Sequence, residues 1–474
     1  MKKSILSILT LLLALVLLLC SCSNHGKTLL EAGKNEVSVN VYKLYLSRMK
    51  GSLSSAGNDV NSDKYWNTYL STDGLTVKDF YSEQVFEGLR QITAALYIYD
   101  ELGLELSKET KDSIDEWIDT LIEEVGEGSK SQLNSILSSY GANVTVLKDA
   151  AIIEAKLEQL KVYLYGEGGS LIGGPAKEEF YQDSYYRGYQ MLLANYYYEH
   201  ELDDDENSRY YGAEGKIAYD TVNGTPTEQT DKNGDVVYRE FGKIAYDTKN
   251  GTPTEERDEE GYRIYVNSEG KIAYDTEKGK ATDKTDKNGD TVYRYWVVAY
   301  DTENGTLKYY EDEKTNTRKT VKYDAEEMGR TLWMANQIAE KCQGNEALFL
   351  AQMEAYGDNQ DFNKQMAPNG MYFSAGSMTG EDVFYTFSTE LAKLEVGDLV
   401  VLESSSGYYI LMRASLDEGA WSKSENSTWF STFSGLCMEY MLQKKTVDYM
   451  QYVIVNDELK KSVDITMVGT NLYY

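Results

Sequence analysis

Residues 189–193 read Tyr-Gln-Met-Leu-Leu, a short apolar run that predicts a buried strand. The glycine-rich stretch Gly166–Gly174 precedes it and predicts a hinge or a domain boundary. An acidic run, Glu199–Glu206, follows it and opens a segment of different composition. The predicted strand therefore lies at the junction between a helical N-terminal region and a segment of another kind.

A five-residue pattern recurs four times after the acidic run. The copies begin at Ile217, Ile244, Ile272 and Val298, and each continues with Ala-Tyr-Asp-Thr. Such self-similarity indicates one supersecondary unit repeated along the chain. Asn-Gly pairs recur between the copies and supply the two positive-φ positions of a type I′ hairpin. These pairs are Asn223-Gly224, Asn233-Gly234, Asn250-Gly251, Asn288-Gly289 and Asn304-Gly305. We therefore predict that residues 215–324 form a β-hairpin array in which each unit buries a face on its neighbour.

The tyrosine of each copy recurs at one phase of the repeat, so the four tyrosines are expected to share a face. They are Tyr219, Tyr246, Tyr274 and Tyr300. That face is either an internal ladder of cross-strand contacts or a platform that binds carbohydrate or peptide. Residues 231–235 and 286–290 read Asp-Lys-Asn-Gly-Asp, but a calcium loop needs its glycine at another position, so we predict acidic turns without metal. No cofactor is expected.

Apolar residues recur at helical spacing from Val37 to about Leu164 and again from Ala325. The clearest stripe alternates spacings of four and three residues: Val85, Leu89, Ile92, Leu96 and Tyr99. Ser107 is suited to cap the helix that follows this stripe.

The C-terminal region predicts one further helix and one strand. Apolar residues at helical spacing favour a helix from about Trp429 to Tyr452, and residues 462–466 favour a closing strand. Together with the array and the buried strand, these helices predict an α+β fold.

The N-terminus has the features of a bacterial lipoprotein signal peptide. Lys2 and Lys3 precede the apolar run Ile5–Leu19, which is short for a membrane span. We expect lipidation of Cys22 after cleavage, and anchoring on the extracytoplasmic face of a bacterial cell membrane. A plain secretory signal is the alternative.

The composition excludes several classes of function. The chain carries 47 basic and 77 acidic side chains, a net charge of −30, and so acidic a surface repels nucleic acid. Its two histidines, His25 and His200, are too few for a histidine-rich metal site. Beyond the signal peptide the cysteines are Cys342 and Cys437, which form either one disulfide or two buried thiols.

The segment from Ala325 to Ala420 resembles a parvulin domain, the PpiC type of peptidyl-prolyl isomerase. Three motifs carry the resemblance: Tyr372-Phe373-Ser-Ala-Gly376-Ser-Met378, Leu394-Glu-Val-Gly397-Asp398 and Gly407-Tyr408-Tyr409-Ile410-Leu411. The N-terminal helices and the ending Glu458–Ile465 resemble foldase lipoproteins of the PrsA and SurA type. The resemblance implies one chaperone domain, built from the flanking helices, around an inserted parvulin module.

The resemblance also implies an apolar pocket that holds a proline ring and favours the twisted imide. Met378 matches the family methionine, and Phe373, Phe384 and Phe387 are the candidates for the rest of the lining. Both family histidines are absent, and Tyr409 stands where the second would be. Tyr409 is therefore the candidate catalytic group, as a hydrogen-bond donor, and weak or absent isomerase activity is expected.

The sequence divides into five predicted parts. They are a signal peptide (1–21), an N-terminal helical chaperone domain (22–174), a parvulin-like α/β domain in two pieces (175–214 and 325–420), the inserted hairpin array (215–324), and a C-terminal helix and strand that pack back on the helical domain (421–474). An insertion at a surface loop costs little free energy, because closure entropy grows only logarithmically with loop length.

Three functions fit these observations. The first is a lipid-anchored chaperone that holds unfolded or partly folded secreted polypeptides outside the membrane. The second is an active peptidyl-prolyl isomerase with a site that lacks histidine. The third is a surface adhesin or wall-binding protein that contacts carbohydrate or cell wall through residues 215–324.

Overall fold

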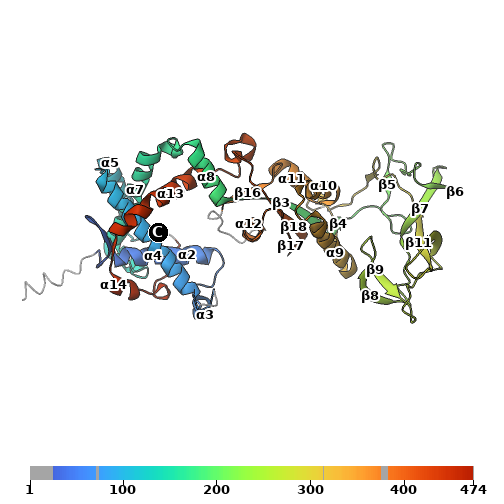
Figure 1. Cartoon of the computed structure of the whole chain (residues 1–474), viewed down its shortest axis with the longest axis horizontal. Coiled ribbons are helices and arrows are strands. Elements are labelled where there is room, and N and C mark those ends of the chain that lie inside the picture. Colours follow the sequence, from blue (N-terminus) through green and yellow to red (C-terminus); the bar gives the residue numbers. More distant parts are fainter. Residues whose placement is uncertain (1–24, 71–73, 313, 375–382, 473–474) are drawn as a thin grey trace, which may run out of the picture. The chain divides into compact units, whose positions relative to one another are not determined.

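The computed structural model describes residues 25–70, 74–312, 314–374 and 383–472, without the side chains of residues 383–385. The chain divides into two compact units (Figure 1). Unit 1 comprises Met1–Tyr186, Tyr372–Ala392 and Leu416–Tyr474, and unit 2 comprises Arg187–Met371 and Lys393–Ser415. Helices and antiparallel sheets are both abundant, so the fold is α+β, as predicted. The five-part division by sequence stays a prediction.

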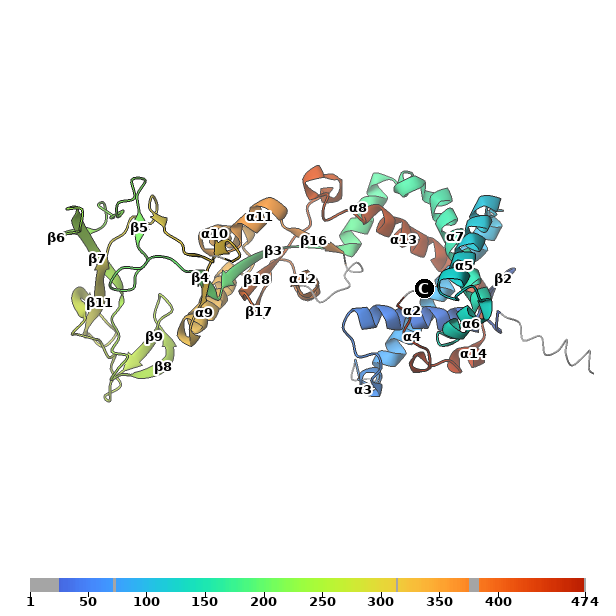
Figure 2. The ribbon, with the colours of Figure 1, turned by 180° about the vertical axis from the view of Figure 1, so that it is seen from behind.

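Unit 1 is mainly helical. Its longest helix, α4 (Val77–Glu101), begins with a capping box in which Thr76 and Asp79 exchange hydrogen bonds. The predicted stripe of α4 is largely buried, and α2 lies beside it (Figure 2). Ser107 caps α5, as predicted. The other α-helices of this unit are α2 (Val39–Ser55), α3 (Asp63–Trp66), α5 (Lys108–Glu124), α6 (Lys130–Ser138), α7 (Val144–Tyr165), α8 (Gly174–Ser184), α12 (Val383–Lys393), α13 (Phe433–Thr446) and α14 (Asp457–Lys461).

The two ends of unit 1 share one sheet and one core. Strand β1 (Thr28–Ala32) pairs antiparallel with β2 (Asn35–Ser38) and with β19 (Ile454–Val455). The Lys50 ammonium donates to the Val468 carbonyl at 2.8 Å. The C-terminal segment therefore completes the packing of the N-terminal helices.

Two predictions for the C-terminal region are wrong. Residues 462–466 form no strand: a 3₁₀ turn, Ile465–Met467, forms there, because the Asp464 carboxylate accepts the Thr466 backbone N–H. The last long helix is also shorter than predicted, because α13 begins four residues after Trp429 and a 3₁₀ segment follows it. That segment is Val447–Tyr452.

A sheet and two helices form one body of unit 2. Strand β3 (Tyr185–Ala194) contains the predicted strand, and it pairs with β18 (Gly407–Ala414), which pairs on its other side with β17 (Leu399–Ser404). Helices α9 (Ala325–Cys342) and α10 (Glu346–Tyr356) cover one face (Figure 1). Segments before and after the array therefore fold together in this body. The buried core residues are Tyr189, Met191, Leu193, Ala335, Ile338, Cys342, Phe349, Tyr408, Ile410, Met412 and Ala414.

The array enters and leaves this body on one antiparallel pair, β4 (Tyr196–Tyr198) with β15 (Thr320–Lys322). Its largest sheet has the strand order β10-β11-β7-β6. The other strands pair two by two, β8 with β9, β5 with β12 and β13 with β14. The strands are β5 (Tyr210–Tyr211), β6 (Thr225–Thr230), β7 (Val236–Ile244), β8 (Thr252–Arg257), β9 (Arg263–Val266), β10 (Gly279–Thr285), β11 (Thr291–Val298), β12 (Thr306–Leu307), β13 (Glu311–Asp312) and β14 (Thr317–Arg318).

The four copies pair the first with the fourth and the second with the third. In each pair, the aspartate N–H of each copy donates to the alanine carbonyl of the other copy. The donors and acceptors are Asp220 and Ala299, Asp301 and Ala218, Asp247 and Ala273, and Asp275 and Ala245. The reciprocal bonds of the outer pair therefore join the two copies that lie farthest apart in the sequence.

The repeat tyrosines stack within these pairs. Tyr219 stacks on Tyr300 and Tyr246 on Tyr274, each with ring centroids 6.3 Å apart and nearly parallel rings. Tyr246 and Tyr300 are buried. The tyrosines therefore form internal cross-strand contacts, the first of the two predicted arrangements.

The Asn-Gly turns do not have the predicted type I′ geometry. None of the five asparagines has a positive φ, and only Gly234 and Gly289 of their glycines do. In the repeat turns the aspartate side chain, rather than the asparagine, stabilises the turn. The Asp247 carboxylate accepts the Asn250 backbone N–H at 2.9 Å. Gly251 is required for space, because a Cβ there would lie 2.5 Å from the Asp247 carbonyl oxygen.

No helix in the described part of the chain has both the length and the apolar content required to cross a membrane. The predicted signal peptide and Cys22 lie outside the described residues.

Candidate functional site

One hairpin of the array packs against α9 within unit 2. Asp324 caps α9 and accepts the backbone N–H groups of its first turn. Farther along α9, the Arg330 Nε donates to the Glu260 carbonyl at 2.9 Å, in the turn between β8 and β9. Gly261 lies against the Trp333 ring, where a Cβ would come within 2.6 Å of a ring carbon. A turn with a side chain at that position would not fit so closely.

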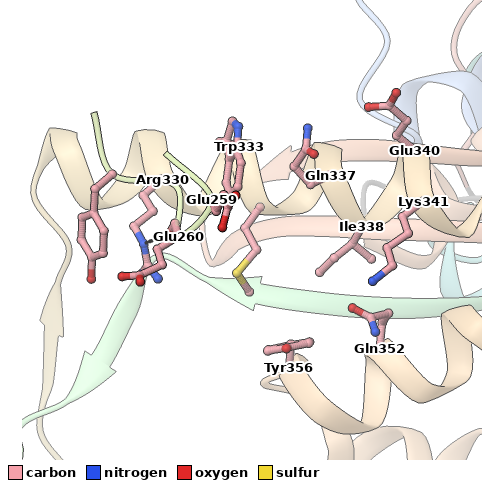
Figure 3. A pocket seen from close by; sticks show the side chains of 12 residues that line it. Glu259, Glu260, Arg330, Trp333, Gln337, Ile338, Glu340, Lys341, Gln352 and Tyr356 are labelled. Carbon is pink, nitrogen blue, oxygen red and sulfur yellow. Dashed lines mark hydrogen bonds between the residues drawn. The ribbon is translucent and has the colours of Figure 1, made fainter. Parts of the chain in front are cut away.

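A groove of about 610 Å³ lies between this turn and helices α9 and α10 (Figure 3). The apolar part of its wall comes from Trp333, Met334 and Ile338 of α9 and from Tyr356 of α10. The Tyr356 side chain is about half exposed, at 53%. The volume lies in the range of sites that bind small molecules or short peptide segments.

The polar side chains of the groove fall into two groups. Arg330 stacks over the Tyr262 ring at 4.6 Å, and Glu260 pairs with Arg294 at 2.6 Å, so these groups have partners. Burial raises the pKa of Tyr262, and Arg330 opposes that rise. The second group makes no side-chain hydrogen bond or ion pair within the described part of the chain: Glu259, Gln337, Glu340, Lys341 and Gln352. Donors and acceptors in this group are therefore available to a ligand.

Tyr409 lies on β18, opposite Leu192 of β3. Burial raises the pKa of its phenol above the usual value. Burial and the neighbouring Tyr198 also raise the pKa of Tyr196, and Asp358 and Tyr409 add to this rise. Tyr409 and Asp358 therefore each lie within electrostatic range of Tyr196.

The remaining predicted site residues are distributed over the chain. Phe373 and Phe387 are buried in unit 1, where Phe373 packs edge-to-face on Trp429 at 5.7 Å. Tyr409 belongs to unit 2. Met378 and the side chain of Phe384 lie outside the described residues. The assignment of these residues to one pocket stays a prediction.

Asp358 and Asn359 are polar residues that the sequence analysis missed. They join α10 to α11 (Gln360–Met366) and bind β3: the Asp358 carboxylate accepts the Ala194 N–H at 2.8 Å, and the Asn359 amide oxygen accepts the Leu192 N–H at 2.9 Å. Partial desolvation raises the pKa of Asp358. Their position after a helix predicts only a turn, so no local signal marks the contact with β3.

Neither histidine takes part in the groove. His25 Nδ1 lies 2.5 Å from the Asp149 carboxylate in unit 1. The two ring nitrogens of His200 lie near the Tyr198 carbonyl and the Ser208 hydroxyl, at 2.6 and 2.8 Å. In the ranges that the structure describes, no cluster of three or more histidine, cysteine or acidic side chains is arranged to hold a metal ion.

No protein-family model matches the chain, and no curated protein matches it in sequence. Among solved structures, the foldase protein PrsA from Streptococcus pneumoniae str. Canada MDR_19A is similar, with 10% identity over 83% of this chain and 96% of that chain. The TM-score is 0.18. A likeness this remote carries no argument about function.

Proposed function

We propose that this protein is a lipid-anchored chaperone that holds unfolded secreted polypeptides outside the bacterial membrane. The observation that carries the proposal is the groove of unit 2, where an apolar wall lies beside side-chain donors and acceptors that have no partner in the described chain. Unfolded chains present both apolar side chains and unpaired backbone groups, so such a groove suits them.

The anchoring follows from the N-terminal sequence. Lys2 and Lys3, the apolar run and Cys22 support cleavage and lipidation. Two acyl chains on Cys22 would bind the bilayer stably, whereas one would bind it only marginally. The acidic body, with its net charge of −30, would stay away from an anionic membrane surface.

The test measures light scattering while a chemically unfolded secreted enzyme is diluted into buffer with the full-length protein in detergent. We expect an equimolar amount to delay aggregation. The control is an equal mass of an inert acidic protein in the same detergent. Scattering equal to that of the control would contradict the chaperone function.

Isomerase activity is the second candidate, and the position of Tyr409 on β18, in the sheet-and-helix body, is the observation that favours it. A half-buried phenol at this position can form a hydrogen bond with a twisted imide. The test is a proline-peptide isomerisation assay with Tyr409→Phe and Met378→Ala as variants. A wild-type rate equal to the uncatalysed rate removes this candidate.

Adhesion through residues 215–324 has less support, because the repeat tyrosines stack on one another. Binding to cells or wall fragments that is unchanged after removal of the array would exclude it.

A further inference from the structure

The walls of the groove differ in origin, since α9 and α10 belong to the sheet-and-helix body and residues 258–262 to the inserted array. Resting on the chaperone function proposed above, we propose that this groove binds an extended client segment in which basic side chains flank an apolar one. The array thereby supplies part of a client site rather than a separate adhesive surface.

The apolar side chain of the client would lie against the apolar wall of the groove, which is formed by Trp333, Met334, Ile338 and Tyr356. Gly261 packs against the Trp333 ring and Ile338 is almost fully buried, so packing fixes these two side chains of the wall. Met334 lines the same wall, and the flexible side chain of methionine adapts to differently shaped apolar groups. A chaperone that accepts many clients requires such tolerance.

The backbone of the client would bind the two amides. Figure 3 shows Gln337 on α9, with its side chain directed away from α10, and Gln352 on α10, directed toward Lys341, and both line the groove. Each amide carries a donor and an acceptor, the same pair that a peptide unit presents. Neither side chain has a partner in the described chain. An extended segment therefore finds hydrogen-bond partners on both helices.

The charges select the flanking side chains. Glu259 lies beside Trp333 and Glu340 lies farther along α9 (Figure 3), and neither has an ion-pair partner among the described residues. Trp333 and Glu340 are about 10 Å apart along the helix axis, and an extended chain covers that length in about three residues. The groove also contains the positive charge of Lys341, whose side chain points toward Gln352 on the other helix. Basic side chains on either side of the apolar residue thus meet the unpaired carboxylates.

The experiment measures fluorescence anisotropy of two labelled peptides with the full-length protein in detergent. One peptide has a central leucine with lysines three positions to each side, and the other has glutamates in place of the lysines. We expect the lysine peptide to bind at least tenfold more tightly. Equal affinities would overturn the proposal.

Reversing the charges of Glu259 and Glu340 tests whether the peptide binds in this groove. In the double variant Glu259→Lys/Glu340→Lys the lysine peptide should bind at least tenfold more weakly, and the preference between the peptides should invert. Glu354→Lys is the matched control, since Glu354 is exposed on α10 outside the groove, and it should change the Kd less than twofold. An unchanged Kd in the double variant would also overturn the proposal. Glu340→Gln, which keeps the size of the side chain, should weaken binding about threefold if the double variant does not fold.

The same double variant separates this inference from the chaperone function. If the wild-type protein delays aggregation but each peptide binds the double variant as tightly as it binds the wild type, the groove is not the client site and the chaperone function stands. If the peptides bind as expected but aggregation is not delayed, the groove binds peptides and the chaperone function fails.

Discussion

At the scale of the residue, the array depends on glycines for two different reasons. Gly251 has ordinary backbone angles but no room for a side chain, since a Cβ would meet the Asp247 carbonyl at 2.5 Å and the Tyr265 Cβ at 3.0 Å. Gly234 has open space around it but a φ of 84°. Substitution at the first site therefore tests packing, and substitution at the second tests backbone conformation.

Gly251→Ala should destabilise the array by about 1–3 kcal/mol, because the backbone that the methyl group meets cannot move aside cheaply. Gly234→Asn should cost about 1 kcal/mol or less, because asparagine tolerates a positive φ. Thermal unfolding followed by the near-ultraviolet circular dichroism of the stacked tyrosines compares the two. A smaller effect for Gly251→Ala than for Gly234→Asn would contradict the packing argument.

Lipidation is a second prediction at this scale. Cys22→Ala should abolish incorporation of labelled palmitate and move the protein from the membrane fraction to the soluble fraction, because the acyl chains provide the anchor. Cys20→Ala is the matched control and should retain both the label and the membrane association. Label retained in Cys22→Ala would show that the acceptor was assigned to the wrong cysteine.

At the scale of the element, the paired repeats make the array sensitive to alkaline pH. Burial and the charge of Asp231 raise the pKa of Tyr219 from its usual 10.0 to about 12. Burial also raises the pKa of its stacking partner Tyr300, and the nearby Asp203 carboxylate adds to the rise. The folded array therefore holds phenolic protons that the unfolded chain releases between pH 10 and about 12.

The sign of the effect follows from this difference in bound protons. The contribution of Tyr219 to stability is fully present below pH 10 and is lost as the pH rises from 10 through about 12. Urea unfolding at pH 9 and pH 11.5 should therefore show the array losing stability at the higher pH. Tyr219→Phe should lose less than the wild type over the same interval. An equal loss in both proteins would mean that Tyr219 does not contribute.

At the scale of the whole molecule, the array is an insertion whose first and last strands pair with each other. The Glu199 N–H donates to the Lys319 carbonyl at 2.8 Å, next to the β4–β15 pair. The sheet-and-helix body of unit 2 has its own core. The two strands of the pair thus end side by side where the array begins.

Replacement of residues 200–318 by an Asn-Gly turn should therefore leave a folded chain, because a short turn closes the β4–β15 hairpin at little entropic cost. Trp333 would lose its contact with Gly261, so its fluorescence should shift to longer wavelength. Far-ultraviolet circular dichroism and fluorescence check both points. A shortened chain without a cooperative unfolding transition would show instead that the body requires the array.

The cysteines give a second prediction at this scale. Cys342 and Cys437 are free thiols, both fully buried, which decides between the two alternatives left by the sequence. Burial raises the pKa of each thiol, so the reactive thiolate is scarce. Both should react with Ellman's reagent at least 100-fold more slowly in the native protein than in guanidinium. A thermal midpoint that falls on addition of reducing agent would indicate a disulfide instead.

Local patterns in the sequence predicted the elements well, and the failures have identifiable causes. The stripe of α4, the Ser107 cap and the strand at 189–193 depend on residues a few positions apart. The wrong turn type in the array arose because the aspartates, rather than the asparagines, hold the turns. The predicted closing strand does not form, because the Asp464 carboxylate accepts the Thr466 backbone N–H and favours a turn.

The candidate site was less predictable than the fold. The structure shows that Tyr409 lies on a strand of the sheet-and-helix body, and no sequence pattern predicted the groove. Trp333 and Gln352 lie on ordinary amphipathic helices, and the Glu259 turn is distant in sequence. No spacing within either segment indicates that the two surfaces meet.

The sequence by itself determined the α+β class, the four copies of the repeat and the helices, since propensity, periodicity and capping act over a few residues. Tertiary structure decided which copies pair, which glycines lack room for a side chain and where Gly261 meets Trp333. The physical reason is that hydrogen bonds and packing between distant segments depend on their positions in space, which local sequence patterns do not specify.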